Sequence, residues 1–500
     1  MALPLSAPKR NRAEAVLLTG RRWLEAARPF AAPATAALIV LAAVFFRQLD
    51  VPKDRTIWAE DGVVFAQCLF DRSVLQCLGE PYAGYLHEVA RLVAMVATAG
   101  DPAMMPFLFT LAAGIVAAWC AWTVAVTVRD VTASTVAGVF AGASLGLVFQ
   151  AGREVLGNVT NLHWILLAAA VVVIVCSWLG RRPRPWDLAL IAATALSSPL
   201  APFLPILGFG AVVARTRDAW RHLLLVTLFA VPQTVVLMQA TRELPQGWFG
   251  LRPAIAGFWD LVIAQGWFGG RGLPPDVVVP LALFGLTIGV VLLARLPLRH
   301  ANGESDPGQS DTTSERPELS AGLGHRLIVL TALLCIGAAI FLVSVLLNRW
   351  IAPRYSYDAA ALTSIAVAMA GGWVTREGRR RSLGSSGDQE AAAAQSPSSR
   401  DRAPIPAVAR LALIARRSVL AVVLVISIGF GLSFRVESLA SPGPDVVAAI
   451  NAARGLCGPA TPAVTIAVSP SNLRRMRMTI PCDRLTGGRT SWTRGTHKGA

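Results

Sequence analysis

Long apolar runs constrain this chain more than any other feature of its sequence. Ala32–Phe46, Ala103–Thr127 and Leu327–Leu347 are long enough, or nearly so, to cross about 30 Å of hydrocarbon as helices. Backbone amides find no water inside lipid, so helices are the natural spanning structure. Hydrophobic residues make up 54% of the chain and charged residues only 15%, against about 25% charged in soluble domains. We therefore predict an all-α polytopic membrane protein.

The formal net charge of +16 does not indicate a nucleic-acid-binding protein. The basic residues lie in short clusters between apolar runs and form no continuous stripe. Such clusters mark the cytoplasmic ends of membrane spans. No small-residue cleavage site follows the first apolar run, so we expect this run to remain as a span.

The basic clusters predict the topology. Residues 1–28 are cytoplasmic, 29–375 form a transmembrane module with an outer loop at 47–102, and 435–500 form a small extracytoplasmic tail. A disordered cytoplasmic loop at 376–408 precedes the last transmembrane helix, within 409–434. The individual spans are predicted at 29–46, 103–127, 131–149, 161–180, 222–239, 276–296, 327–347, 359–375 and 418–434, with Arg129 between the second and third and a further polar loop at 301–322.

The stretch 187–214 is predicted to enter the membrane and return. Basic clusters at both of its ends place those ends inside. At about 1.5 Å per residue the stretch is too short for two full crossings. Pro199 and Pro202 interrupt it near the middle. Counting two short half-helices here gives about eleven passes, with the N-terminus inside and the C-terminus outside.

Four cysteines fall in the predicted outer segments. Cys68 and Cys77 lie in the first outer loop, and Cys457 and Cys482 lie in the tail. An oxidising compartment allows disulfides between the members of each pair. Free buried thiols are the alternative, and the sequence leaves both open.

The first outer loop carries two adjacent carboxylates, Glu60 and Asp61, just before an apolar stretch. At the head of a helix they lie at the favourable end of its dipole, which keeps them ionised. An ionised carboxylate there can take a proton from a hydroxyl or hold a divalent cation. The alternative is an ordinary helix N-cap with a solvated neighbour.

Tyr85, His87, Glu88 and Arg91 form a second polar cluster, within an amphipathic segment at 85–99. If the helix begins at Gly84, His87 and Arg91 share a face and Glu88 reaches Arg91. The segment is too charged to span a membrane and is predicted to lie at the interface. An ordinary interfacial helix explains its apolar residues, but explains the grouped polar residues less well.

Two further polar clusters lie on the same predicted face. Arginine suits a lipid phosphate because its planar guanidinium matches phosphate oxygens; the alternative for a single arginine is a headgroup anchor. No nucleotide-binding loop or zinc-spaced Cys/His set occurs. The residues concerned are Glu154, Asn158, Asn161 and His163 before the 161–180 span, and Arg349, Arg354 and Tyr355 before the 359–375 span.

This pattern resembles the GT-C superfamily of integral membrane glycosyltransferases. Its members share a multi-helix membrane fold and an acidic pair directly after the first span, which Glu60-Asp61 match in type and place. Pro353-Arg354-Tyr355 resembles an Arg-Tyr element found late in several members. Short broken helices around the middle are also familiar in this fold. Unlike the better-known members, this chain has only the short tail 435–500.

The resemblance implies a reaction and its participants. A polyprenyl-phosphate-linked sugar would be transferred, with inversion, to an envelope glycan or lipid acceptor at the outer face of the cytoplasmic membrane. Asp61 or Glu60 would be the base, Arg354 would bind the leaving phosphate, and Mg²⁺ or Mn²⁺ would bind at Asp61. The expected substrate-binding residues are Tyr85, His87, Arg91, Glu154, Asn158, Asn161, His163, Arg349, Arg354 and Tyr355.

Two other functions remain open. A transporter or lipid flippase of envelope precursors would also use broken helices and polar groups at membrane depth. A non-catalytic envelope assembly protein would use the cytoplasmic loops as docking segments. Against the transporter, the polar residues gather on the outer face and the two halves show no internal repeat.

Overall fold

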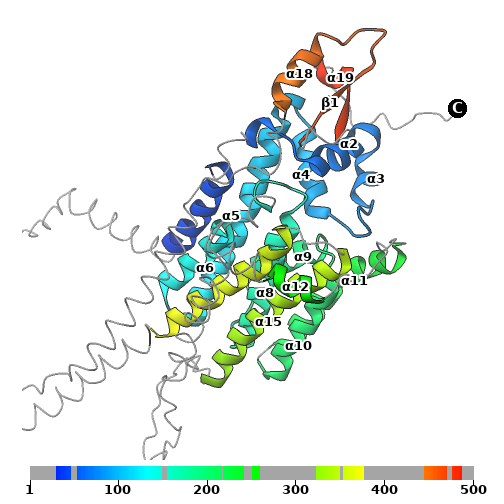
Figure 1. Ribbon diagram of the computed structural model, residues 1–500. Helices are drawn as coiled ribbons and strands as arrows, with labels where there is room; N and C mark the ends of the chain where they lie inside the picture. Colours follow the sequence, from blue (N-terminus) through cyan, green and yellow to red (C-terminus); the bar gives the residue numbers. More distant parts are fainter. Residues whose placement is uncertain are drawn as a thin grey trace, which may run out of the picture.

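The computed structural model is mostly helical (Figure 1). The residues it describes are 30–46, 53–148, 155–216, 218–240, 251–258, 323–348, 353–374, 376, 444–469 and 476–486.

Several of the described helices are candidates for membrane spans. Three are long and apolar enough to cross a bilayer: Pro102–Thr132, Ala219–Gln239 and Gly324–Leu346. These helices agree with the predicted class of helical membrane protein. The predicted spans at 276–296 and 418–434, the loop at 301–322 and, apart from Arg376, the loop at 376–408 lie outside the described residues. Shorter apolar helices cover Phe30–Phe46, Thr135–Leu147, Leu162–Ser177 and Ala201–Val213.

Helices α5 (Met105–Thr132), α6 (Thr135–Leu147) and α8 (Leu162–Ser177) form the centre of the molecule. Small residues bring α5 and α6 together, since a Cβ at Gly142 would lie 2.4 Å from the Ala121 carbonyl oxygen. Every residue of α8 is buried, as an all-round apolar helix should be. The two predicted helices are separate, but the turn between them lies at 133–134, and Arg129 lies in the last turn of α5 rather than between the helices.

The stretch predicted to be broken consists of α9 (Pro185–Ala195), a 3₁₀ turn at Ala201–Phe203 and α10 (Leu204–Val213). Near the end of α9, Thr194 Oγ1 donates to the Leu166 carbonyl, early in α8, at 3.1 Å. On α10, the Leu207 carbonyl accepts from Trp178 Nε1, after the end of α8, at 2.9 Å. The two short helices therefore run along α8 and back, as predicted from the prolines and the basic clusters.

Gln233 of α11 (Ala219–Gln239) ties this break to the first outer loop. Its Oε1 accepts from the Leu86 amide and its Nε2 donates to the Ser198 carbonyl, both at 3.0 Å. The Val89 amide donates to Ser197 Oγ at 3.1 Å. Backbone groups freed by the break thus find partners inside the protein, as buried groups require.

The first outer loop folds into short helices. A helix runs through a π-helical stretch, Asp61–Ala66, into α2 (Gln67–Asp71); α3 (Val74–Leu78) and α4 (Glu88–Thr98) follow. The expectation that the helix begins at Gly84 was wrong. Tyr82 and Tyr85 exchange backbone hydrogen bonds of 2.9 and 3.2 Å around a turn, in which Gly84 has a φ of 84°.

The described part of the tail packs on that loop. It contains α18 (Val446–Arg454), an antiparallel pair β1 (Ala463–Ala467) and β2 (Arg477–Pro481), and α19 (Cys482–Leu485). In Figure 1 this orange and red unit lies beside α2. Contacts that join the two are Ser469 N to Ile57 O at 2.9 Å, Thr479 N to Gln67 Oε1 at 2.7 Å, and the Arg55–Asp445 ion pair at 2.6 Å.

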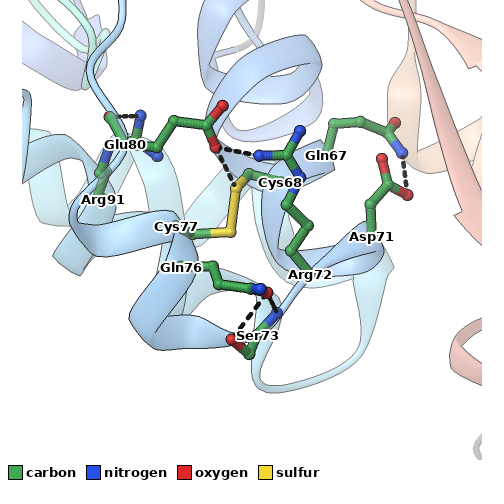
Figure 2. Close-up of a disulfide and its surroundings, with 9 residues drawn as sticks. All are labelled: Gln67, Cys68, Asp71, Arg72, Ser73, Gln76, Cys77, Glu80 and Arg91. Atoms are coloured by element: carbon green, nitrogen blue, oxygen red, sulfur yellow. Dashed lines mark hydrogen bonds and ion pairs between the residues drawn. A yellow bond between two sulfur atoms is a disulfide. The ribbon is translucent and has the colours of Figure 1, made fainter. Parts of the chain in front are cut away.

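Two disulfides stabilise this end of the molecule. Cys68 is bonded to Cys77, linking α2 to α3 (Figure 2). Cys457 is bonded to Cys482, linking the segment after α18 to α19. These are the two pairs that the sequence allows.

We predict that Gln233→Leu lowers the free energy of unfolding by about 1–3 kcal/mol, because buried backbone groups lose their partners. Unfolding in detergent by a chemical denaturant measures the change. Gln239→Leu, at an exposed position of the same helix, is the control. Equal effects of the two substitutions would show that the buried hydrogen bonds of Gln233 contribute nothing.

Candidate functional site

Asp61 binds a segment that lies 98 residues further along the chain. Its Oδ2 accepts from the Val159 amide at 3.0 Å, and its Oδ1 accepts from the Thr160 amide at 2.8 Å. The Thr160 hydroxyl also donates to Oδ1. Three donors therefore converge on one carboxylate, which is only 2% exposed. Such an arrangement stabilises the ionised form.

Burial nevertheless raises the pKa of Asp61 to about 6. The hydrogen bonds from Thr160 and Val159 lower the pKa and oppose this effect, and the neighbouring Glu60 charge raises it slightly. Desolvation dominates because the carboxylate is taken out of water. Asp61 is thus ionised at neutral pH but close to its titration range.

The two adjacent carboxylates differ in environment. Glu60 is partly exposed, and no hydrogen bond or ion pair joins its side chain to another described residue. The alternative interpretation expected a helix cap here, but Asp61 does not cap its own helix. Its carboxylate instead binds the segment that leads into α8. The geometry therefore places Asp61 in the site.

His163, in the first turn of α8, lies next to the segment that Asp61 holds. Its Nδ1 is 2.9 Å from the Thr160 carbonyl oxygen. Its ring centroid lies 5.8 Å from those of Tyr85 and His87 and 4.7 Å from that of Trp164. His163 is thus the residue at which the first outer loop and the segment before α8 meet.

The Arg-Tyr element joins the same cluster from a third segment. Arg354 and Tyr355 lie in a 3₁₀ turn, Pro353–Ser356, ahead of a helix at 357–374. The Tyr355 ring lies 5.8 Å from the Trp164 ring, and Arg354 Cζ lies 5.2 Å from the Tyr355 ring centroid. The charge of Arg354 acts on His163. Three segments that are distant in sequence therefore converge.

His87 and Arg91 lie on the side of the first outer loop. The His87 ring is 4.0 Å from the Tyr85 ring. Burial, followed by the electrostatic interactions with His163 and Arg91, holds the pKa of His87 well below its usual value, so the ring is neutral at pH 7. Arg91 is on the buried face of α4 and lies over Phe65, with 5.4 Å between Cζ and the ring centroid.

The expected contact between Glu88 and Arg91 is not an ion pair. Their charges interact, but no bridge between them is found among the described residues. Arg91 instead donates to the Glu80 carbonyl oxygen. The later start of α4, at Glu88, places this glutamate at the helix end rather than within a turn.

The remaining predicted residues are placed only in part. Asn158 and Asn161 are buried beside the Asp61 anchor, whereas Glu154 and Arg349 lie outside the described residues. Sequence reasoning missed two buried residues. Thr160 gave no signal because its partner is so distant in sequence. Asp358 is fully buried in the helix at 357–374; its place at the head of an apolar run was the available signal.

A divalent metal does not fit at Asp61. Oδ1 already accepts two hydrogen bonds and Oδ2 accepts one, so Asp61 offers a cation little, whereas a hard cation needs several oxygen ligands. The described residues contain no group of three His, Cys, Asp or Glu side chains that could hold a metal. No step of the chemistry below uses Mg²⁺ or Mn²⁺.

No family model, curated protein or solved structure matches this chain.

We predict that wild type loses stability relative to Asp61→Asn as the pH rises from about 4 to 7. Because the folded pKa of Asp61, about 6, exceeds the unfolded value, the folded state holds the proton more tightly. The stabilisation is full below the unfolded pKa and is lost as the pH passes 6. The difference between the melting temperatures of the two proteins in detergent measures this effect. A difference that does not change with pH would contradict the raised pKa of Asp61.

Proposed function

We propose that this protein is a membrane glycosyltransferase of the GT-C type, which transfers a sugar from a polyprenyl-phosphate donor to an envelope acceptor. The observation that supports this most is the convergence on His163 of an acid and an arginine from distant segments. Asp61 reaches it through Thr160, and Arg354 reaches it through Tyr355 and Trp164. Such a transfer needs a carboxylate base to deprotonate the acceptor and a cation to bind the phosphate.

Asp61 is the proposed base. A carboxylate with a pKa of about 6 is ionised at neutral pH and basic enough to take a proton in the transition state. Since both oxygens already have donors, the acceptor hydroxyl takes the place of the Thr160 hydroxyl on Oδ1. The proton passes to Asp61 as the acceptor oxygen bonds to the anomeric carbon.

Arg354 is the proposed ligand of the leaving group. The bond between the anomeric carbon and the phosphate oxygen breaks, and its electron pair leaves with the lipid phosphate. A guanidinium stabilises that charge through directed hydrogen bonds. The stacking of Arg354 on Tyr355 holds it in place. A single displacement of this kind inverts the anomeric centre.

The membrane arrangement is part of the same proposal. The chain would cross the cytoplasmic membrane about eleven times, with the N-terminus inside and the tail outside. The two disulfides of the first outer loop and the tail suit an oxidising outer compartment. The site would then face the side on which polyprenyl-linked sugars are used.

A deletion strain tests the proposal. Envelope glycans are compared after complementation with wild type, Asp61→Asn and Asp71→Asn, all at equal membrane abundance. Asp71 is exposed at the end of the same helical stretch and serves as the control. We expect one glycan component to disappear in the deletion strain, Asp71→Asn to restore it, and Asp61→Asn to fall short by about 100-fold or more.

Two results would contradict this account. If Asp61→Asn and Glu60→Gln both restore every glycan, the acidic pair is only structural, and a transporter or assembly role becomes the better account. If Glu60→Gln fails while Asp61→Asn succeeds, the assignment of Asp61 is wrong and the base is Glu60.

A further inference from the structure

A buried arginine at the far end of the site lacks partners for most of its donors. Arg91 is 2% exposed. Its Nη2 donates to the Glu80 carbonyl oxygen, but Nε and Nη1 have no hydrogen-bond partner among the described residues. Guanidinium donors that are buried without acceptors are costly. The fold keeps them at a position that also contacts the aromatic residues of the site.

The nearby carboxylates do not neutralise Arg91 directly. Glu80 turns its carboxylate to Arg72, with 2.7 Å between Oε2 and Nη1 (Figure 2). It hydrogen-bonds to Arg91 only through its backbone carbonyl, and its carboxylate acts on Arg91 through charge. Glu88 interacts with Arg91 through charge alone. An anion can therefore bind to Arg91 without displacing an existing ion pair.

His87 supplies a complementary atom close by. It lies one helical turn before Arg91, whose amide donates to the His87 carbonyl oxygen at 3.0 Å. The His87 ring lies 5.5 Å from the Phe65 ring, on which Arg91 also stacks. The ring bonds to the Tyr82 backbone, whereas Nε2 is buried without a partner. In the neutral ring this Nε2 is a hydrogen-bond acceptor.

This pair is separate from Arg354. The charge of Arg91 acts on His87, and the charge of Arg354 acts on His163. The two histidine rings are themselves 5.8 Å apart. The site thus has one arginine at each end of its aromatic cluster, and only Arg354 was assigned to the donor phosphate.

We propose that Arg91 and His87 form a second subsite, which binds a phosphate monoester. Such a group offers oxygens to one edge of the Arg91 guanidinium and a P–OH to His87 Nε2, whereas a carboxylate lacks the hydroxyl. On the proposed function, this phosphate belongs to the acceptor, which is then a phosphorylated glycan or a lipid phosphate. Binding itself does not depend on that assignment.

Titration calorimetry on the full-length protein in detergent tests the subsite, with glucose 6-phosphate and farnesyl phosphate as probes. We expect Arg91→Gln to weaken binding about 10-fold or more, because charged hydrogen bonds are lost. Arg477→Gln, exposed on β2, should bind as wild type does. Unchanged binding in a folded Arg91→Gln protein overturns the proposal.

Comparison of the two probes on the wild-type protein provides a test that does not depend on folding of the variant. Binding of glucose 6-phosphate indicates a phosphorylated glycan, and binding of farnesyl phosphate alone indicates a lipid phosphate. Lack of binding of both overturns the subsite. Binding together with unchanged glycans in the deletion strain keeps the subsite and rejects the transferase.

Discussion

The carboxylate of Asp61 holds the site together. Its three hydrogen bonds to Val159 and Thr160 join the first outer loop to the start of the central helix α8. Loss of these hydrogen bonds from a buried carboxylate would cost free energy, so the two segments are fixed relative to each other. The Thr160 carbonyl then positions His163, around which the aromatic residues gather.

The sequence predicts most of the helices, because runs of apolar residues have few other ways to fold in lipid. It also predicts the break at 196–200, because prolines interrupt the stretch and basic clusters at both of its ends place those ends on the same side of the membrane. It does not predict that Asp61 and Thr160 meet, since a hydrogen bond between distant segments leaves no local pattern. The tail sheet and the start of α4 at Glu88 were missed for a similar reason: contacts with the loop and a glycine turn decided them.

The residues of the site lie in an order that follows from the position of Asp61. Arg354 lies at one end with Tyr355, Arg91 lies at the other with His87, and Asp61 and His163 lie between them. The amide of Gln233 connects the Arg91 side to the broken helices 185–213. In the proposed transfer the acceptor and the leaving group lie on opposite faces of the anomeric carbon, with the base on the acceptor side.

Hydrogen exchange of the segment 155–161 tests the central claim most directly, because the amides of Val159 and Thr160 donate to Asp61. Mass spectrometry would compare wild type with Asp61→Asn, whose side-chain NH₂ cannot accept from them. We predict faster exchange in this segment, with α9 unchanged. Equal exchange in both proteins would mean that Asp61 does not hold the segment, and the proposed site would lose its centre.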